Sequence, residues 1–166
     1  LPVVKPDDLE DVPPIGVEFA LWPFDHRRIA DAGLWRAAVR AYLACVSYCD
    51  ELVGRIIDAL DSSPNRDNTI VVLASDNGFH HGQKLHWSKF ALWEEASRVP
   101  LMLRVPNSHL YRGVSQQPVS LVDIWPTLHR LAGTTSDIAA DGEPLPAPIF
   151  PIVKRRIPVL TTWQRD

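Results

Sequence analysis

The spacing of apolar residues predicts one long helix in the first half of the chain. From residue 34 to residue 60, apolar side chains recur at spacings of three and four, the period of a helix with one face on a core. Charged side chains fall on the opposite face, and the run Ser62-Ser63-Pro64-Asn65 interrupts the pattern. We therefore expect an amphipathic helix over residues 34–60.

Short apolar runs after this helix predict strands. Residues 69–74 are typical of a strand buried on both faces, and residues 100–105 and 157–163 form two further strand-like runs. Between them, Ser120 predicts the start of a short helix that Gly133 ends. The alternation of helices and strands predicts an α/β fold with a layered sheet.

The first 33 residues follow no periodic pattern. Prolines at positions 2, 6, 13, 14 and 23 each remove a backbone donor and restrict the preceding residue. The acids of this segment, Asp7, Asp8, Glu10 and Asp11, are typical of solvated surface. We expect residues 1–33 to be a proline-rich irregular segment and residues 34–166 to form the α/β domain.

Composition and charge exclude several classes of protein. The 166 residues are 46% hydrophobic and 22% charged, as in ordinary globular proteins. A net charge of −3 gives no electrostatic reason to expect nucleic acid, and no apolar run reaches the ~20 residues of a membrane span. Cys45 and Cys49 predict neither a zinc site nor a disulfide framework, so they indicate no compartment.

Two side chains with oxygen donors follow the first predicted strand. Asp76 and Asn77 come just after Ala74, and in open α/β sheets ligands bind at the carboxyl ends of strands. Carboxylate and amide oxygens suit calcium or magnesium. The alternative is an ordinary Asp-Asn-Gly turn without a ligand.

Imidazoles and cations follow within the same segment, residues 75–89. They are His80, His81, Lys84, His86 and Lys89. Cations and neutral imidazole donors stabilise the charge that develops on an anionic ester. The segment therefore predicts a site for a phosphate or sulfate ester, whereas each residue taken alone is typical of a solvated loop.

Four runs of sequence form an ordered series that includes this segment. They are A-Y-L-A-C-V-S-Y-C-D-E-L-V-G-R-I-I-D-A-L at 41–60, S-D-N-G-F-H-H-G-Q-K-L-H-W-S-K-F-A-L-W-E-E-A-S-R-V-P-L at 75–101, P-V-S-L-V-D-I-W-P-T-L-H-R-L-A-G at 118–133 and D-G-E-P-L at 141–145. The series resembles the second half of the type I sulfatase pattern in the alkaline phosphatase superfamily, above all its iduronate-2-sulfatase-like and choline-sulfatase-like members. The resemblance implies part of a layered α/β/α sheet with largely parallel strands and flanking helices.

The resemblance also implies an activity and roles for matched residues. The activity is calcium-dependent hydrolysis of sulfate esters through a formylglycine made from a C/S-x-P-x-R motif. Asp76 and Asn77 match calcium ligands, and Lys89 matches the lysine that holds the sulfate group during catalysis. His86 is a second candidate catalytic residue, and Lys84 and His81 are candidate substrate contacts.

The sequence departs from the family pattern at the nucleophile. The letters S-x-P-x-R occur only at Ser62–Arg66, in the turn between the long helix and the first strand, where the family has a variable surface loop. The N-terminal calcium-binding Asp-Asp pair is also missing, and the first residue is Leu1. We therefore expect a middle-to-late fragment, inactive by itself, with half of the calcium ligands and the formylglycine in another part.

Three interpretations stay open at this stage. The first is a sulfatase fragment, and the second is a phosphonate monoester or phosphodiester hydrolase of the same superfamily, which tends to have His at the position of Asn77. The third is a non-catalytic remnant without the nucleophile half. The expected partners are a sulfate ester and either a second copy of the chain or the missing N-terminal part, with no nucleic acid and no membrane.

Overall fold

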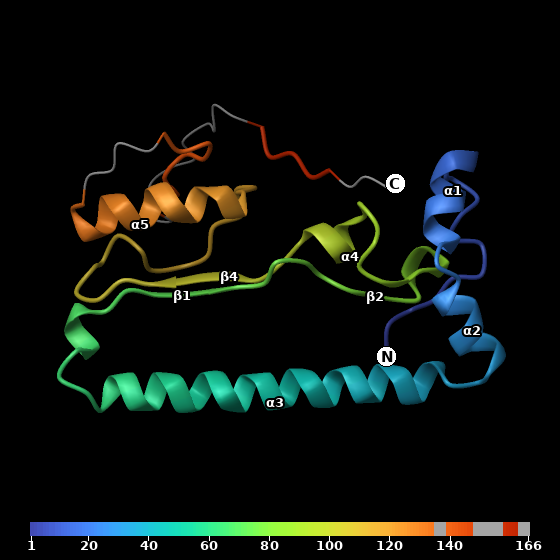
Figure 1. Ribbon diagram of the computed structural model, residues 1–166, viewed down its shortest axis with the longest axis horizontal. Coiled ribbons are helices and arrows are strands. Elements are labelled where there is room, and N and C mark those ends of the chain that lie inside the picture. Colours follow the sequence, from blue (N-terminus) through green and yellow to red (C-terminus); the bar gives the residue numbers. More distant parts are fainter. Residues whose placement is uncertain (135–138, 148–157, 163–166) are drawn as a thin grey trace.

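The protein combines helices with two small sheets in a layered arrangement (Figure 1). The computed structural model describes residues 1–134, 139–147 and 158–162. Its helices are α1 (Pro14–Leu21), α2 (Asp25–Asp31), α3 (Trp35–Asp61), α4 (Glu94–Ser97) and α5 (Ile124–Ala132), with 3-10 turns η1 (Arg66–Asn68), η2 (Gln83–Leu85) and η3 (Leu121–Asp123). Its strands are β1 (Val71–Ala74), β2 (His80–His81), β3 (Trp87–Ser88) and β4 (Leu101–Arg104). None of the helices in these residues is long and apolar enough to cross a membrane.

Helix α3 confirms the prediction from apolar spacing. It covers Trp35–Asp61, so its ends lie within one residue of the expected range. Val39 is buried on its inner face. Near its start, the indole N–H of Trp35 donates to the carbonyl of His81, at 2.6 Å, and so fixes the helix against segment 75–89.

The predicted direction of the strands is wrong for the described residues. Strand β1 pairs with β4 antiparallel, from Val71 opposite Arg104 to Ala74 opposite Leu101, and β2 pairs with β3 antiparallel. A parallel pair needs a crossover of a dozen or more residues, usually through a helix that carries the chain back to the start of the first strand. Residues 75–100 instead fold as a hairpin and the four-residue α4, and return the chain in the opposite direction.

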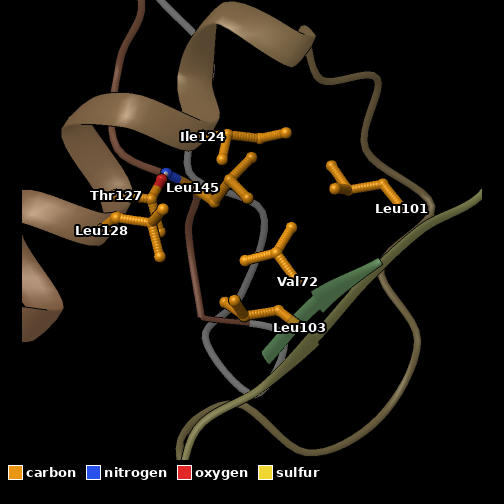
Figure 2. Close-up of a pocket in the computed structure, with 7 residues that line it drawn as sticks. All are labelled: Val72, Leu101, Leu103, Ile124, Thr127, Leu128 and Leu145. Carbon is orange, nitrogen blue, oxygen red and sulfur yellow. Dashed lines mark hydrogen bonds between the residues drawn. The ribbon is translucent and has the colours of Figure 1, made fainter. Parts of the chain in front are cut away.

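Strand β1 is also less buried than the sequence predicts. Val71, Val72 and Leu73 are half-buried and Ala74 is exposed. Only one face of the strand pair meets α5, where apolar side chains of β1, β4 and α5 point toward one another (Figure 2). The cavity between them is only ≈ 10 Å³, about the space of one water molecule, so this region is core and no ligand site.

Residues 1–33 contain two helices, which corrects the prediction of an irregular segment. Helix α1 begins at Pro14, where a missing N–H costs nothing because the first helical N–H groups have no partner in the helix. Helix α2 follows Phe24, which adopts a left-handed conformation. The prolines therefore lie at the helix start and in the connections rather than breaking the helices.

The last predicted strand is absent from the part of its run that the structure describes. Of the run 157–163, only residues 158–162 are described, and they belong to no strand. The short helix predicted after Ser120 is confirmed as η3 followed by α5, with Gly133 at its end in a left-handed conformation.

Candidate functional site

The segment after β1 brings Asn77 and Lys89 together. The ammonium of Lys89 donates to Oδ1 of Asn77 at 3.0 Å, and the backbone N–H of Asn77 donates to Oδ1 of Asp76 at 3.0 Å. The hydroxyl of Ser75 donates to the carbonyl of Asn77 at 2.7 Å and holds the turn. Asp76 and Lys89 are exposed and Asn77 is half-buried, so a carboxylate and an ammonium face solvent beside an amide oxygen at the carboxyl end of β1.

The β2–β3 hairpin explains how residues 12 positions apart meet. His80 lies opposite Ser88, and His81 lies opposite Trp87. Because Lys89 follows β3 directly, the antiparallel register returns it to the start of the hairpin.

Gly78 lets the segment approach α4 closely. Its N–H donates to the carbonyl of Ala96 at 2.8 Å, and a Cβ built on Gly78 would lie 2.0 Å from the carbonyl oxygen of Glu95. No other residue fits this position without moving the backbone.

The hairpin turn binds Lys84 to the N-terminal segment. The backbone N–H of Lys84 donates to Oδ2 of Asp8 at 2.7 Å, and its ammonium donates to the carbonyl of Asp8 at 2.8 Å and to Oδ1 of Asp11 at 2.9 Å. The hydrogen bond with Asp11 raises the pKa of Lys84 and lowers the pKa of Asp11. The ammonium of Lys84, a predicted substrate contact, thus has two intramolecular hydrogen-bond acceptors in this structure.

His80 and His86 are buried inside the hairpin. They are 0% and 1% exposed, and their rings stand almost perpendicular with centroids 5.1 Å apart. Nδ1 of His80 is bonded to the carbonyl of Gln83 at 3.2 Å, and Nδ1 of His86 to the carbonyl of Ala20 at 2.7 Å. Burial lowers the pKa of each, so both are neutral near pH 7.

His81 faces an aromatic cluster on α3 and the hairpin. Its ring packs edge-on against Tyr42, with centroids 4.2 Å apart, and it also contacts Phe79 and Trp87. Its Nε2 is buried without a partner in the described chain, and burial lowers its pKa. The structure thus groups Asp76, Asn77 and Lys89 on the surface but directs His81 inward.

Two histidines that each have one buried, unpartnered ring nitrogen among the described residues receive no role in the prediction from sequence. The sequence analysis names His80 among the histidines of residues 75–89 but assigns it no role. His26 lies in residues 1–33, which the sequence predicts to be irregular. Nδ1 of His26 is buried without a partner, and burial followed by the nearby His86 lowers its pKa. The clustering of histidines in the sequence hints at His80, whereas nothing local signals His26.

The oxygen donors fit part of a calcium site. Asp76 and Asn77 supply hard oxygens on adjacent residues, and calcium takes six to eight such ligands. Within residues 1–134, 139–147 and 158–162, no group of three or more His, Cys, Asp or Glu side chains could hold a metal ion. The two residues therefore fit a calcium ion only together with further ligands.

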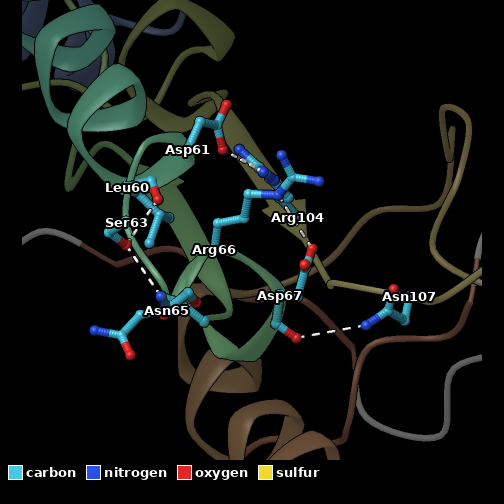
Figure 3. Close-up of polar contacts among 9 residues, drawn as sticks. Leu60, Asp61, Ser63, Asn65, Arg66, Asp67, Arg104 and Asn107 are labelled. Atoms are coloured by element: carbon cyan, nitrogen blue, oxygen red, sulfur yellow. Dashed lines mark hydrogen bonds and ion pairs between the residues drawn. The ribbon is translucent and has the colours of Figure 1, made fainter.

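The S-x-P-x-R letters at Ser62–Arg66 lie away from this site. They form the turn from α3 to β1, at the amino end of the strand, whereas Asp76 follows its carboxyl end. Figure 3 shows the polar contacts of the turn: Ser63 donates to the carbonyl of Leu60 at 2.8 Å, and Arg66 pairs with Asp67 at 3.4 Å. The turn is therefore a surface connection, and the prediction that it holds no nucleophile stays a prediction.

Comparison with protein families identifies the class to which this fold and site belong. The family model described as Sulfatase matches residues 7–134, which is most of the chain. The chain belongs to the sulfatase family, a family of hydrolases, as the order of its sequence runs predicts.

Individual relatives agree with this assignment. The chain is 41% identical over 135 residues to a sulfatase from Formosa agariphila and 38% identical over 134 residues to a choline-sulfatase from Rhizobium meliloti, which covers 80% and 79% of this chain. It is also 43% identical over 68 residues to iduronate 2-sulfatase from Mus musculus. This match covers 41% of this chain and 12% of the mouse protein. The chain spans only 26% of the length of each of the first two relatives.

A solved structure confirms the fold class. A putative sulfatase from Bacteroides thetaiotaomicron superposes with a TM-score of 0.64 at 25% identity, over 87% of this chain and 33% of the other. The α/β prediction is therefore confirmed, although the strand pairs described here are antiparallel.

Proposed function

We propose that this chain supplies one half of a sulfate-ester hydrolase site. The observation that carries the proposal is the hydrogen bond from Lys89 to Asn77, beside Asp76, at the carboxyl end of β1. A cation and two hard oxygen donors thus lie side by side in a chain that belongs to the sulfatase family, which supports the proposal.

The chemistry of each residue follows from its charge. The ammonium of Lys89 holds an oxygen of the sulfate group and stabilises the negative charge that develops when the ester bond breaks. Asp76 and Asn77 hold a calcium ion, with further ligands from a part of the protein outside this chain. When bound, calcium acts as a Lewis acid on the sulfate oxygens. The nucleophile is a formylglycine, also outside this chain.

The substitution Lys89→Ala tests this proposal. In the protein that joins this chain to a C/S-x-P-x-R segment, we expect kcat/KM for 4-nitrophenyl sulfate to fall by roughly 10²–10³-fold, because a positioned charge in the site is lost. Lys5→Ala, at an exposed lysine of the N-terminal segment, is the matched control and should leave turnover unchanged.

Several results of these turnover measurements would contradict the proposal. Unchanged turnover in Lys89→Ala rejects the role of Lys89, and faster hydrolysis of a phenyl phosphonate than of the sulfate favours the phosphonate hydrolase. Turnover by the 166 residues alone rejects the expectation that the nucleophile lies elsewhere, and no turnover in the joined protein favours a non-catalytic remnant.

A further inference from the structure

His86 connects helix α1 to the hairpin that ends at Lys89. Its ring is 1% exposed, and its Nδ1 lies 2.7 Å from the carbonyl oxygen of Ala20, 66 positions away in sequence. His86 is three residues before Lys89, and its own carbonyl accepts the N–H of Gly82 at 2.9 Å, which closes the hairpin turn. One residue therefore joins the hairpin both to itself and to α1.

The partner of Nδ1 fixes the tautomer of this histidine. A carbonyl oxygen only accepts, so Nδ1 of His86 carries the proton and donates it. Because burial lowers the pKa of the ring, Nε2 carries no proton near pH 7. Nε2 is buried without a hydrogen-bond partner among the described residues, so it faces no exposed surface that a substrate could reach.

The turn before His86 needs such an anchor. Lys84 and Leu85 both have positive φ, at 53° and 49°, and Gly82 has φ 118°. Left-handed conformations at non-glycine residues are unfavourable and persist only where surrounding contacts hold them. The bond to Ala20 is one such contact, and the bonds from Lys84 to Asp8 are another.

We propose that His86 is a positioning residue for Lys89, which acts through the hydrogen bond from its Nδ1 to the Ala20 carbonyl and does not touch the substrate. The inference rests on the proposed function, since it assigns a supporting role to the residue that precedes the sulfate-binding lysine. It replaces the catalytic role that the sequence predicts for His86. Helix α1, through the carbonyl of Ala20, then helps to hold Lys89 in position.

The substitutions His86→Asn and His86→Gln separate the two ring nitrogens. The amide nitrogen of Asn occupies the place of Nδ1, whereas that of Gln extends to the place of Nε2. We expect His86→Asn to bind 4-nitrophenyl sulfate, with CaCl2 present, within about threefold of the unchanged chain, and His86→Gln to bind it about tenfold more weakly, since a buried carbonyl loses its donor. His109→Asn and His109→Gln, at an exposed histidine, are the matched controls.

A double substitution tests whether His86 acts through Lys89. In a Lys89→Ala background, His86→Gln should weaken binding of the ester no further, because the group that it positions is gone. The proposal would be overturned if the losses of affinity from His86→Gln and Lys89→Ala were additive. It would also be overturned if His86→Asn and His86→Gln lost affinity equally, or if His86→Gln bound the ester as tightly as the unchanged chain.

Hydrogen exchange keeps the test independent of the proposed function. If the chain alone binds no sulfate ester because its calcium site is incomplete, the amides of residues 82–89 decide about His86, whereas turnover in the joined protein decides about the proposed function. Their exchange should be several-fold faster in His86→Gln than in His86→Asn, with equal far-ultraviolet circular dichroism, since a lost anchor allows local opening. Equal exchange in the two variants would refute the positioning role.

Discussion

At the scale of single residues, the candidate site divides into a group at the end of β1 and a buried group. Asp76, Asn77 and Lys89 meet at the end of β1, where the strand end marks the first two as candidates and the resemblance to sulfatases selects all three. The sequence also selects Lys84 and His86 for contact with substrate, but the structure gives them partners at Asp8 and Ala20. Those partners are 76 and 66 positions away, so no local pattern reveals them.

The substitution Asp76→Asn tests the metal half of the site. Removing the carboxylate charge should weaken calcium binding by at least about tenfold, because affinity for calcium rises with the number of charged ligands. Isothermal titration with CaCl2 measures the effect in the protein that joins this chain to a C/S-x-P-x-R segment, where the further calcium ligands are expected. Asp67→Asn, at an exposed acid before β1, is the control, and an equal loss in both variants would show that only the overall charge matters.

At the scale of elements, periodicity predicts helices better than sheet pairing. The spacing of apolar residues places α3 almost to the residue, and the apolar runs place β1 and β4. The direction of strand pairing depends on the path of residues 75–100, which no pattern within the strands records. Helices α1 and α2 were missed because prolines at a helix start and prolines in a loop look alike in sequence.

The close contact between Gly78 and α4 predicts a large effect of one methyl group. Gly78→Ala should lower the free energy of unfolding by about 1–3 kcal/mol or more, because the added Cβ meets a backbone oxygen that cannot rotate away. Gly54→Ala is the matched control, since nothing lies within 4 Å of its Cβ and alanine favours a helix by about 1 kcal/mol. Urea unfolding of both variants measures the difference, and equal stabilities would contradict the clash.

At the scale of the whole molecule, apolar surface is unevenly covered. Large apolar side chains of α3, namely Leu43, Val46, Tyr48 and Ile56, are exposed. Apolar side chains that are exposed singly are normal on protein surfaces, so these four positions do not by themselves indicate a contact surface. Association with a second copy of the chain or with the remaining part of a sulfatase stays a prediction.

Four buried or half-buried histidines predict that acid destabilises the chain. Burial lowers the pKa of His26, His80, His81 and His86 below the ordinary value of 6.5. The unfolded chain therefore binds more protons than the folded chain, so the free energy of unfolding is highest above pH 6.5 and falls as the pH drops through 6.5.

Urea unfolding at pH 8.0, 6.5 and 5.0 measures this dependence. His26→Gln removes one of the four titrating groups and should give a shallower slope below pH 6.5, whereas His109→Gln at an exposed position should leave the slope unchanged. A free energy of unfolding that is constant from pH 8.0 to pH 5.0 would show that folding does not lower the pKa of the four imidazoles.

The contact between Asp8 and Lys84 has a consequence for the order of folding. It joins positions 76 apart, so the loop that it closes includes α1, α2, all of α3 and β1. We expect contacts of such long sequence separation to form late, because the chain must lose the entropy of closing the loop before it gains the free energy of the contact. We therefore expect the left-handed turn at Lys84 and Leu85 to acquire this anchor only after α3 has formed and the N-terminal segment has docked, so that the geometry around Lys89 forms late in folding.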